Sequence, residues 1–415
     1  MNILKKTVGN WVDGQRFFDR DDDLLFLRES VQDGTNVLLT GQRRMGKTSL
    51  VRELLRDLKV NDGASTLFVD LEDARDPADA IVKIVSEARN SASLWERVTQ
   101  WLGESLAGVV AEASYAEFKV ALRAQIHTGN WKDKGDAVLE TIAGKGGDQV
   151  VIAIDELSLL INHVLKGDDY KISREGVEEA RELMAWLRRN CQMHRDRITM
   201  VVLGSVGLPP ILKQAGLSAT MNTFSNYELR PWDQRTASDC LSELATTYGL
   251  DLSVGVRRAM CQRLRACIPH HVQQYFDAVH RRLRLVGRSK ASLQDVEEAY
   301  RNDMLGTRGR IDRDHYEDRL KLILGLEAYP LALEILARTA RAGVWTPSDQ
   351  LEYEHELQTL EEGGATTMSL VLDVLEHDGY LARRANGFRF ESGLLEDWQR
   401  VSLGLPPTDL NECRH

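Results

Sequence analysis

A glycine-rich loop between an apolar run and a helix-forming run has the residue spacing of a phosphate-binding site. Residues 41–48 read Gly-Gln-Arg-Arg-Met-Gly-Lys-Thr, after the apolar residues 36–40 and before the helix-forming residues 49–55. The pattern needs Gly41 and Gly46 because the backbone turns tightly there and points its N–H groups, with the start of the next helix, at negative charge. The spacing therefore predicts a site for a nucleoside triphosphate.

Three residues at the end of this loop have predicted contacts with the nucleotide. Lys47 is expected to reach the β- and γ-phosphates, and the Thr48 hydroxyl to ligate Mg²⁺. Ser49 completes the predicted cofactor-binding set in the first turn of the helix. Arg43 and Arg44 also lie in the loop, where they face either solvent or a neighbouring domain, and the sequence assigns them no role.

Two adjacent carboxylates follow a second apolar run. Residues 150–154 are apolar and lead directly into Asp155 and Glu156. Phosphate chemistry needs this arrangement, since the strand end directs Asp155 at the Mg²⁺ and lets Glu156 polarise an attacking water. The alternative is an acid pair that only caps the helix beginning at Leu157.

A hydroxyl follows a third apolar run. Residues 199–203 end in Gly204 and Ser205, which predicts that Ser205 lies beside the same site and senses the γ-phosphate. A serine that only stabilises a local turn is the alternative. The predicted catalytic set is Glu156, Lys47 and Ser205.

The apolar runs predict the element that positions these residues. With residues 36–40, further runs at 66–70, 150–154, 199–203 and, more weakly, 223–229 make five strands. Near-continuous apolar strands separated by helical patterns indicate a parallel sheet covered on both faces. We therefore predict an α/β P-loop nucleotide domain over residues 10–230. The long stretch 78–145 is predicted to be a helical insertion, with its tryptophans as core anchors.

The rest of the chain has a different pattern. From residue 231 to 305 it is helical throughout, which predicts an all-helical lid domain. Residues 310–404 then read as helices, a short hairpin around 379–391 with Asn386-Gly387 at its turn, and a last helix. Helices followed by a two-stranded wing predict a C-terminal winged-helix domain.

Composition limits the classes of protein that fit. The chain has 415 residues, is 43% hydrophobic and carries a net charge of −10. No apolar stretch approaches the roughly 20 residues that span a bilayer, so no membrane partner and a cytoplasmic location are expected. The net charge argues against a protein that coats nucleic acid by bulk electrostatics. Five cysteines without a C-x-x-C pair predict buried thiols.

The order of motifs resembles a known family. Phe17-Phe18-Asp19-Arg20-Asp21-Asp22-Asp23 precedes the loop, and the apolar run before Asp155 follows it. This order resembles the archaeal-type predicted ATPases of the STAND class, a branch related to the AAA+ proteins. The resemblance implies ATP and Mg²⁺ as cofactors, and a contact of Arg20 with the adenine. Only Arg20 matches the family's first motif literally.

The resemblance also points to a motif in the helical region. The family places Gly-x-Pro beside the base, and Cys267-Ile268-Pro269 resembles it with Cys267 in place of Gly. Pro269 is therefore expected to contact the base or ribose. The alternative is a proline at the start of a helix.

Charge is divided unevenly along the chain. Residues 256–290 hold nine basic residues and one acidic residue, whereas residues 331–404 hold six basic and thirteen acidic. The basic stretch faces nucleotide phosphates, nucleic acid, the acidic segment or only solvent. We expect the acidic segment to dock on the basic stretch in one nucleotide state, and reversing Arg281, Arg282 and Arg284 to Glu to disrupt that docking. Residues 366–378, the helix that would read DNA, contain no Lys or Arg, so phosphate repulsion disfavours DNA there.

These observations favour an ATP-binding and slowly hydrolysing switch that acts on a partner protein of unknown identity. One alternative is a DNA-associated AAA+ ATPase similar to origin-recognition or transposition ATPases, and another is a scaffold that binds nucleotide without hydrolysing it. Residues 206–227, where AAA+ motors commonly carry an arginine finger, contain no arginine. Arg188, Arg189 and Arg230 are alternatives, and the sequence does not choose among them.

Overall fold

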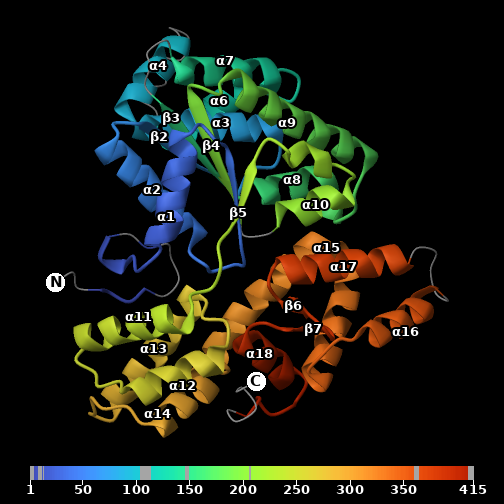
Figure 1. Ribbon diagram of the computed structural model, residues 1–415. Coiled ribbons are helices and arrows are strands. Elements are labelled where there is room, and N and C mark those ends of the chain that lie inside the picture. Colours follow the sequence, from blue (N-terminus) through green and yellow to red (C-terminus); the bar gives the residue numbers. More distant parts are fainter. Residues whose placement is uncertain are drawn as a thin grey trace. The chain divides into compact units, whose positions relative to one another are not determined.

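The computed structural model describes residues 4–7, 12, 14–102, 114–144, 149–204, 207–358 and 364–409. The chain divides into two compact units (Figure 1). The sheet unit comprises the described residues of Arg20–Thr40 and Lys47–Glu228, and the helical unit those of Met1–Asp19, Gly41–Gly46 and Leu229–His415. Residues 41–46 of the phosphate loop thus pack with the helical unit, although the chain continues from them directly into the sheet unit.

A five-stranded parallel sheet forms the core of the sheet unit. Its order is β2-β3-β4-β1-β5, which confirms the predicted sheet. Every residue of the central strands β3 and β4 is buried, as expected for a sheet covered on both faces. Because all strands run the same way, their carboxyl ends meet at one edge. The strands are β1 Val37–Thr40, β2 Ser65–Asp70, β3 Val150–Asp155, β4 Ile198–Leu203 and β5 Ser225–Glu228.

Helices cover the sheet, and Figure 1 shows them in blue to green. Among them α2 packs on β2, β3 and β4, while α8 and α9 pack on β4. The helices are α1 Asp21–Gln32, α2 Lys47–Asn61, α3 Pro77–Glu87, α4 Ala92–Leu102, α6 Tyr115–Gln125, α7 Trp131–Ala143, α8 Leu157–Lys166, α9 Arg174–Met193 and α10 Leu208–Gln214. Short turns of 3-10 helix are η2 Ala88–Asn90, η3 Gly167–Asp169 and η4 Ser218–Met221.

The helices α3, α4, α6 and α7 form the insertion between β2 and β3. Trp131 is buried, and its ring meets that of Trp186 edge-on at a centroid distance of 5.5 Å. Trp95 meets Phe118 in the same way at 5.7 Å. These contacts confirm the prediction that tryptophans of the insertion anchor a core.

The helical unit begins with the short turn η1 Gly14–Arg16 and, after the sheet unit, a group of packed helices. The Asp233 carboxylate accepts the Thr236 N–H at 2.7 Å and caps α11. Pro269 is the first residue of α13, where a missing N–H costs nothing. The elements are α11 Gln234–Thr247, α12 Val254–Leu264, α13 Pro269–Leu285, α14 Leu293–Ala299 and the π-turn η5 Tyr300–Met304.

Longer helices and a hairpin complete this unit. Helix α15 is broken at Gly325, whose φ of 72° lies outside the helical region, so its two parts correspond to two predicted helices. The antiparallel hairpin turns through Ala385 and Asn386, one position before the predicted Asn386-Gly387 turn, and Gly387 is the first residue of β7. The elements are α15 Thr307–Ala342, α16 Pro347–Gln358, α17 Gly364–His377, β6 Leu381–Arg384, β7 Gly387–Phe390 and α18 Gly393–Ser402.

Basic and acidic segments of the helical unit meet between α12 and α18. Arg265, which follows α12, forms an ion pair with Glu396 of α18. The buried Arg263 lies 3.9 Å from the carboxylate of the buried Asp397. The two charged segments therefore meet at these arginines, whereas docking that depends on the nucleotide stays a prediction.

The prediction is wrong for Arg281 and Arg282. Arg281 pairs with Asp277 at 2.9 Å, one turn away on the same helix, and Arg282 pairs with Glu298 of α14. Acids close in the sequence satisfy these arginines, and a charge count over a long segment does not reveal such local pairing.

Over the part of the chain that the structure describes, no helix is both long and apolar enough to cross a membrane.

Candidate nucleotide site

The two predicted metal ligands lie together in the sheet unit. Thr48 is the second residue of α2, and Asp155 is the last residue of β3. The Thr48 hydroxyl donates to Asp155 Oδ2 at 2.8 Å, although the two residues are 107 positions apart. The packing of α2 on β3 brings them together.

Burial and neighbouring charge disfavour the ionised form of Asp155. Its side chain is nearly inaccessible, and burial, followed by the Glu156 and Asp70 carboxylates, raises the pKa of Asp155 to about 6. The Thr48 hydroxyl and the Lys47 ammonium act in the opposite direction but do not cancel the effect. A cation at Asp155 would remove the cost of this buried charge.

The oxygen atoms present fit Mg²⁺. Thr48 and Asp155 offer a hydroxyl and a carboxylate, the hard ligands that this ion prefers. Within the described ranges, no group of three or more His, Cys, Asp and Glu could hold a metal ion by itself. This agrees with Mg²⁺, which keeps waters and takes phosphate oxygens as ligands rather than a cage made only of protein.

Glu156 has an unusual backbone conformation. Its φ of 59° and ψ of 28° place a residue other than glycine in the left-handed region, and such strain concentrates at functional sites. The residue stands at the N-cap of α8, yet its side chain makes no capping hydrogen bond. Its N–H donates to Asp155 Oδ1 at 3.0 Å. The helix-capping alternative is therefore wrong for Glu156.

Lys47 and Ser49 lie in the first turn of α2. Lys47 is the first residue of this helix and is only 7% exposed, and Ser49 is also buried. The start of a 15-residue helix carries the positive end of the helix dipole, which favours an anion there. The ammonium of Lys47 adds a positive charge at the same helix end.

The sequence analysis missed two charged residues near Asp155. Asp70 ends β2 and is the register partner of Asp155 on the adjacent strand. Arg52 lies one helical turn after Thr48, with its guanidinium 3.9 Å from the centre of the Phe68 ring. Burial lowers the pKa of Arg52, and the charges of Asp155 and Asp70 oppose that effect. The position of Asp70 at the end of an apolar run was a usable signal.

The glycines of the loop have the positive φ angles that the motif requires. Gly41 has a φ of 133°, and a Cβ there would lie 2.4 Å from the carbonyl oxygen of Leu229. Gly46 has a φ of 91°, which side chains rarely allow. Any larger residue at position 41 would collide with backbone.

Side chains of the loop contact the C-terminal elements within the helical unit. Gln42 is buried, and its amide nitrogen donates to the Gly379 carbonyl at 2.9 Å. A larger residue at position 379 would obstruct this contact, because its Cβ would lie 2.6 Å from Gln42 Cδ. Arg43 donates to the carbonyl oxygen of His315 on α15 at 3.0 Å.

Arg44 has the strongest of these contacts. Its guanidinium pairs with Asp312 of α15 at 2.6 Å and lies 2.7 Å from His270 Nε2. Burial, then the charge of Arg44, lowers the pKa of His270 to about 3, so a neutral imidazole accepts this hydrogen bond. Asp312 also accepts from Gln274 at 2.6 Å. The loop arginines thus bind protein groups, a role that the sequence alone did not assign.

The remaining predicted residues have separate positions. Arg20 is buried and pairs with Asp23 at 3.2 Å, and the Tyr227 hydroxyl donates to the same carboxylate. Pro269 begins α13, as its structural alternative predicts, and the adjacent His270 is the residue that meets the loop. Ser205 lies outside the described residues. Contacts of Arg20 and Pro269 with a nucleotide stay predictions.

Comparisons with known proteins agree with this geometry. Residues 30–212 match the family described as an AAA domain. The chain is similar in structure to the Walker-type ATPase of Pyrococcus abyssi, with 14% identity, a TM-score of 0.60, and 96% of this chain and 100% of that chain covered. It is also similar to the Aeropyrum pernix ORC2 protein, solved as ADPNP–ADP complexes, with 10% identity, a TM-score of 0.52, and 97% and 98% covered.

None of the curated proteins has significant sequence similarity to the chain. At the identities above, the structural likeness concerns the fold. Residues 30–212 thus match an AAA domain, and the chain shares its fold with these two solved structures.

Proposed function

We propose that the chain is an ATP-binding and slowly hydrolysing switch that transmits its nucleotide state to a partner protein. The observation that carries the catalytic part is the hydrogen-bonded pair Thr48 and Asp155, directly beside the strained Glu156. Hydrolysis of a phosphoanhydride needs a metal-ligand pair and a second carboxylate for the water. The likeness in fold to a Walker-type ATPase supports the same activity.

Each residue of the site has one role in this proposal. Lys47 pairs with the β- and γ-phosphates, and Thr48 and Asp155 hold Mg²⁺. When bound, this ion offsets the charge that develops on the phosphates. Glu156 orients the attacking water and accepts its proton, a contribution that is typically worth about 10²- to 10⁴-fold in rate.

The switch part rests on the contacts of the loop. Gln42, Arg43 and Arg44 connect the phosphate loop to α13, α15 and the turn at Gly379. Removing one partner of a fully buried ion pair costs about 3–5 kcal/mol, an upper bound for the partly buried Arg44–Asp312 pair. Reversing a 1:99 equilibrium takes about 5.5 kcal/mol, so several of these contacts have to act together. A loop that changes conformation with its nucleotide can therefore change how firmly the C-terminal elements are held, through these few contacts.

Within this proposal, residues 231–305 act as a helical lid and residues 310–404 as a winged-helix domain. The order α15, α16, α17, hairpin and α18 supports the second assignment.

The catalytic proposal is tested with Glu156→Gln. The amide still hydrogen-bonds water but accepts no proton, so ATP binding should persist while turnover falls at least about a hundredfold. Calorimetry measures the affinity and phosphate release measures the rate. Turnover at the parent rate would leave the site as a scaffold that binds nucleotide only.

The switch proposal is tested with Arg44→Ala, and Arg43→Ala is the matched control. Limited proteolysis after residue 305 should differ between the ATP and ADP forms of the parent protein. Arg44→Ala should abolish that difference while ATP still binds, because Asp312 and His270 lose their shared partner in the loop. Arg43→Ala should keep the difference, since Arg43 donates only to a backbone carbonyl on α15. A difference that persists in Arg44→Ala would contradict the switch.

A DNA-associated AAA+ ATPase is the second candidate. The exposed Arg383, Arg384 and Arg389 on the β6–β7 hairpin favour it. Turnover with and without duplex DNA separates the candidates. Stimulation by DNA supports the second, and an unchanged rate supports the switch.

A further inference from the structure

A cavity in the helical unit collects an unusual number of arginines. Its volume is about 940 Å³, and its walls come from the segment before α11, the ends of α12 and α15, the β6–β7 hairpin and α18. Glu391 and Glu396 are the carboxylates in this lining, so the arginines exceed the acids by four. The six arginines are Arg230, Arg265, Arg341, Arg384, Arg389 and Arg400.

Two of these arginines are fixed in place by the protein. Arg400 donates to the carbonyl oxygens of Ala340 and Pro406, both at 2.9 Å. Arg265 pairs with Glu396, and this pair removes one of the two acids from the charge balance. The walls are therefore ordered by contacts that do not depend on a ligand.

Arg341, Arg384 and Arg389 differ from these two. Each is exposed, and among the described residues none of the three forms an ion pair. Like charges that share one cavity repel each other, and nothing in the fold requires three more arginines there. In a chain with a net charge of −10, this positive cavity indicates a site for an anion.

The backbone at Arg265 is strained beside the cavity. Its φ of 56° is positive, and its Nε is buried without a hydrogen-bond partner among the described residues. A strained residue other than glycine is retained mainly at functional sites. Arg265 therefore gives a second reason, independent of the charge count, to treat the cavity as a site.

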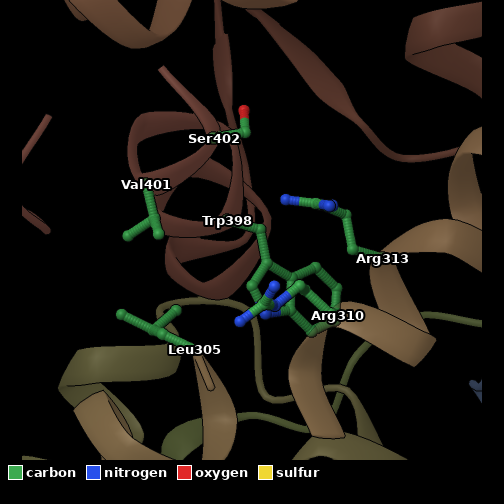
Figure 2. Close-up of a pocket in the computed structure, with 6 residues that line it drawn as sticks. All are labelled: Leu305, Arg310, Arg313, Trp398, Val401 and Ser402. Carbon is green, nitrogen blue, oxygen red and sulfur yellow. The ribbon is translucent and has the colours of Figure 1, made fainter. Parts of the chain in front are cut away.

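A second cavity in the same unit lacks these features. Figure 2 shows its lining, where Arg310 and Arg313 stand beside the Trp398 ring in a space of about 320 Å³. Arg313 pairs there with Glu317 at 3.4 Å, and the Trp398 indole N–H donates to the Met304 carbonyl at 2.8 Å. The smaller cavity is thus lined by two arginines, one of them paired with an acid, whereas the larger one is lined by six.

We infer that the arginine cavity binds a compact ligand with two or more phosphate groups. One guanidinium group can donate two parallel hydrogen bonds to two oxygens of a phosphate. The described lining contains six arginines and no lysine. Small ligands occupy cavities of about 300–1,000 Å³, which is the size found here. This site is separate from the phosphate loop and does not depend on the proposed hydrolysis.

A nucleic-acid duplex fits this cavity less well than a compact ligand. A duplex would extend past the rim toward α17, which contacts β6. That helix contains Asp373 and Glu376 and has no Lys or Arg, and Asp378 follows it. Phosphate repulsion there opposes a long polyanion, whereas a compact ligand avoids it.

The test uses the full chain with Lys47→Ala, so that the phosphate loop does not compete for the probe. Inorganic tripolyphosphate, titrated by calorimetry without metal, should bind this protein. Adding Arg384→Ala and Arg389→Ala should weaken binding at least about tenfold for each arginine, because each loses a charge-assisted contact. Adding Arg383→Ala instead is the matched control, since Arg383 lies on the same hairpin but does not line the cavity. It should change the affinity less than twofold.

Three results would overturn the inference. In the first, tripolyphosphate does not bind the Lys47→Ala protein, and in the second it binds equally well without Arg384 and Arg389. In the third, a single-stranded or a duplex oligonucleotide binds through these arginines and tripolyphosphate does not. That result would assign the cavity to nucleic acid. Both arginines are exposed, so the variants should keep the parent's melting temperature, and ATP affinity measured with Lys47 intact should not change.

Discussion

The charge on Asp155 should lower the contribution of this residue to the stability of the metal-free protein as the pH rises from 4 to neutral. Burial, then the Glu156 carboxylate, raises the pKa of Asp155 from 3.8 to about 6. Each pKa unit corresponds to about 1.4 kcal/mol, so keeping Asp155 ionised costs the folded protein about 3 kcal/mol. Between pH 4 and 6 the unfolded chain has lost this proton while the folded chain keeps it. The contribution of Asp155 to stability therefore falls as pH rises through that window.

Asp155→Asn removes the charge and keeps an oxygen that accepts from the Thr48 hydroxyl. In the presence of a chelator at pH 7.5, the region around β3 and α2 should become more stable by up to about 3 kcal/mol. The decline of stability between pH 4 and 6 should be reduced by the same amount. With Mg²⁺ and ATP the parent protein should instead be more stable than Asp155→Asn, because only the parent has the carboxylate to bind the ion.

Amide hydrogen exchange of β3 and α2 is the assay, since it reports local opening in a chain of two units that need not unfold together. Asp169→Asn is the control, because Asp169 is an exposed carboxylate of the same unit. Equal exchange rates in Asp155→Asn and the parent protein at both pH values would refute the argument that the ionised form of Asp155 destabilises the folded protein.

Three further predictions follow from single contacts. Lys47→Ala should weaken ATP binding by about ten- to a hundredfold in calorimetry, because a charge-assisted contact is worth about 1.5–3 kcal/mol. Gly379→Ala should lower the melting temperature more than Gly343→Ala. Both have φ near 75°, but only at Gly379 would the Cβ meet another side chain, Gln42 at 2.6 Å. Arg189→Ala should leave turnover per chain unchanged at any protein concentration, since Arg189 pairs with Asp136 at 2.6 Å. If turnover per chain rises with protein concentration in the parent and not in this variant, Arg189 is an arginine finger.

The local features of the nucleotide site could be predicted from the sequence. Gly41 and Gly46 have the positive φ angles that the motif demands, and Asp155 stands at the end of a buried strand. These features depend on a few consecutive residues: a tight turn needs glycine, and a buried parallel strand needs a continuous apolar run. The five strands followed from the same local patterns, and only their order in the sheet had to come from the structure.

Only the tertiary structure decided which distant residues meet. Arg44 contacts Asp312 and His270, more than two hundred positions away, and charge totals along the chain assigned it no partner. The same totals wrongly selected Arg281, which an acid one turn away satisfies. The arginine cavity is assembled from five separate segments, and no spacing in the sequence predicts it. Local patterns determine turns and elements, whereas the pairing of charges depends on how those elements pack.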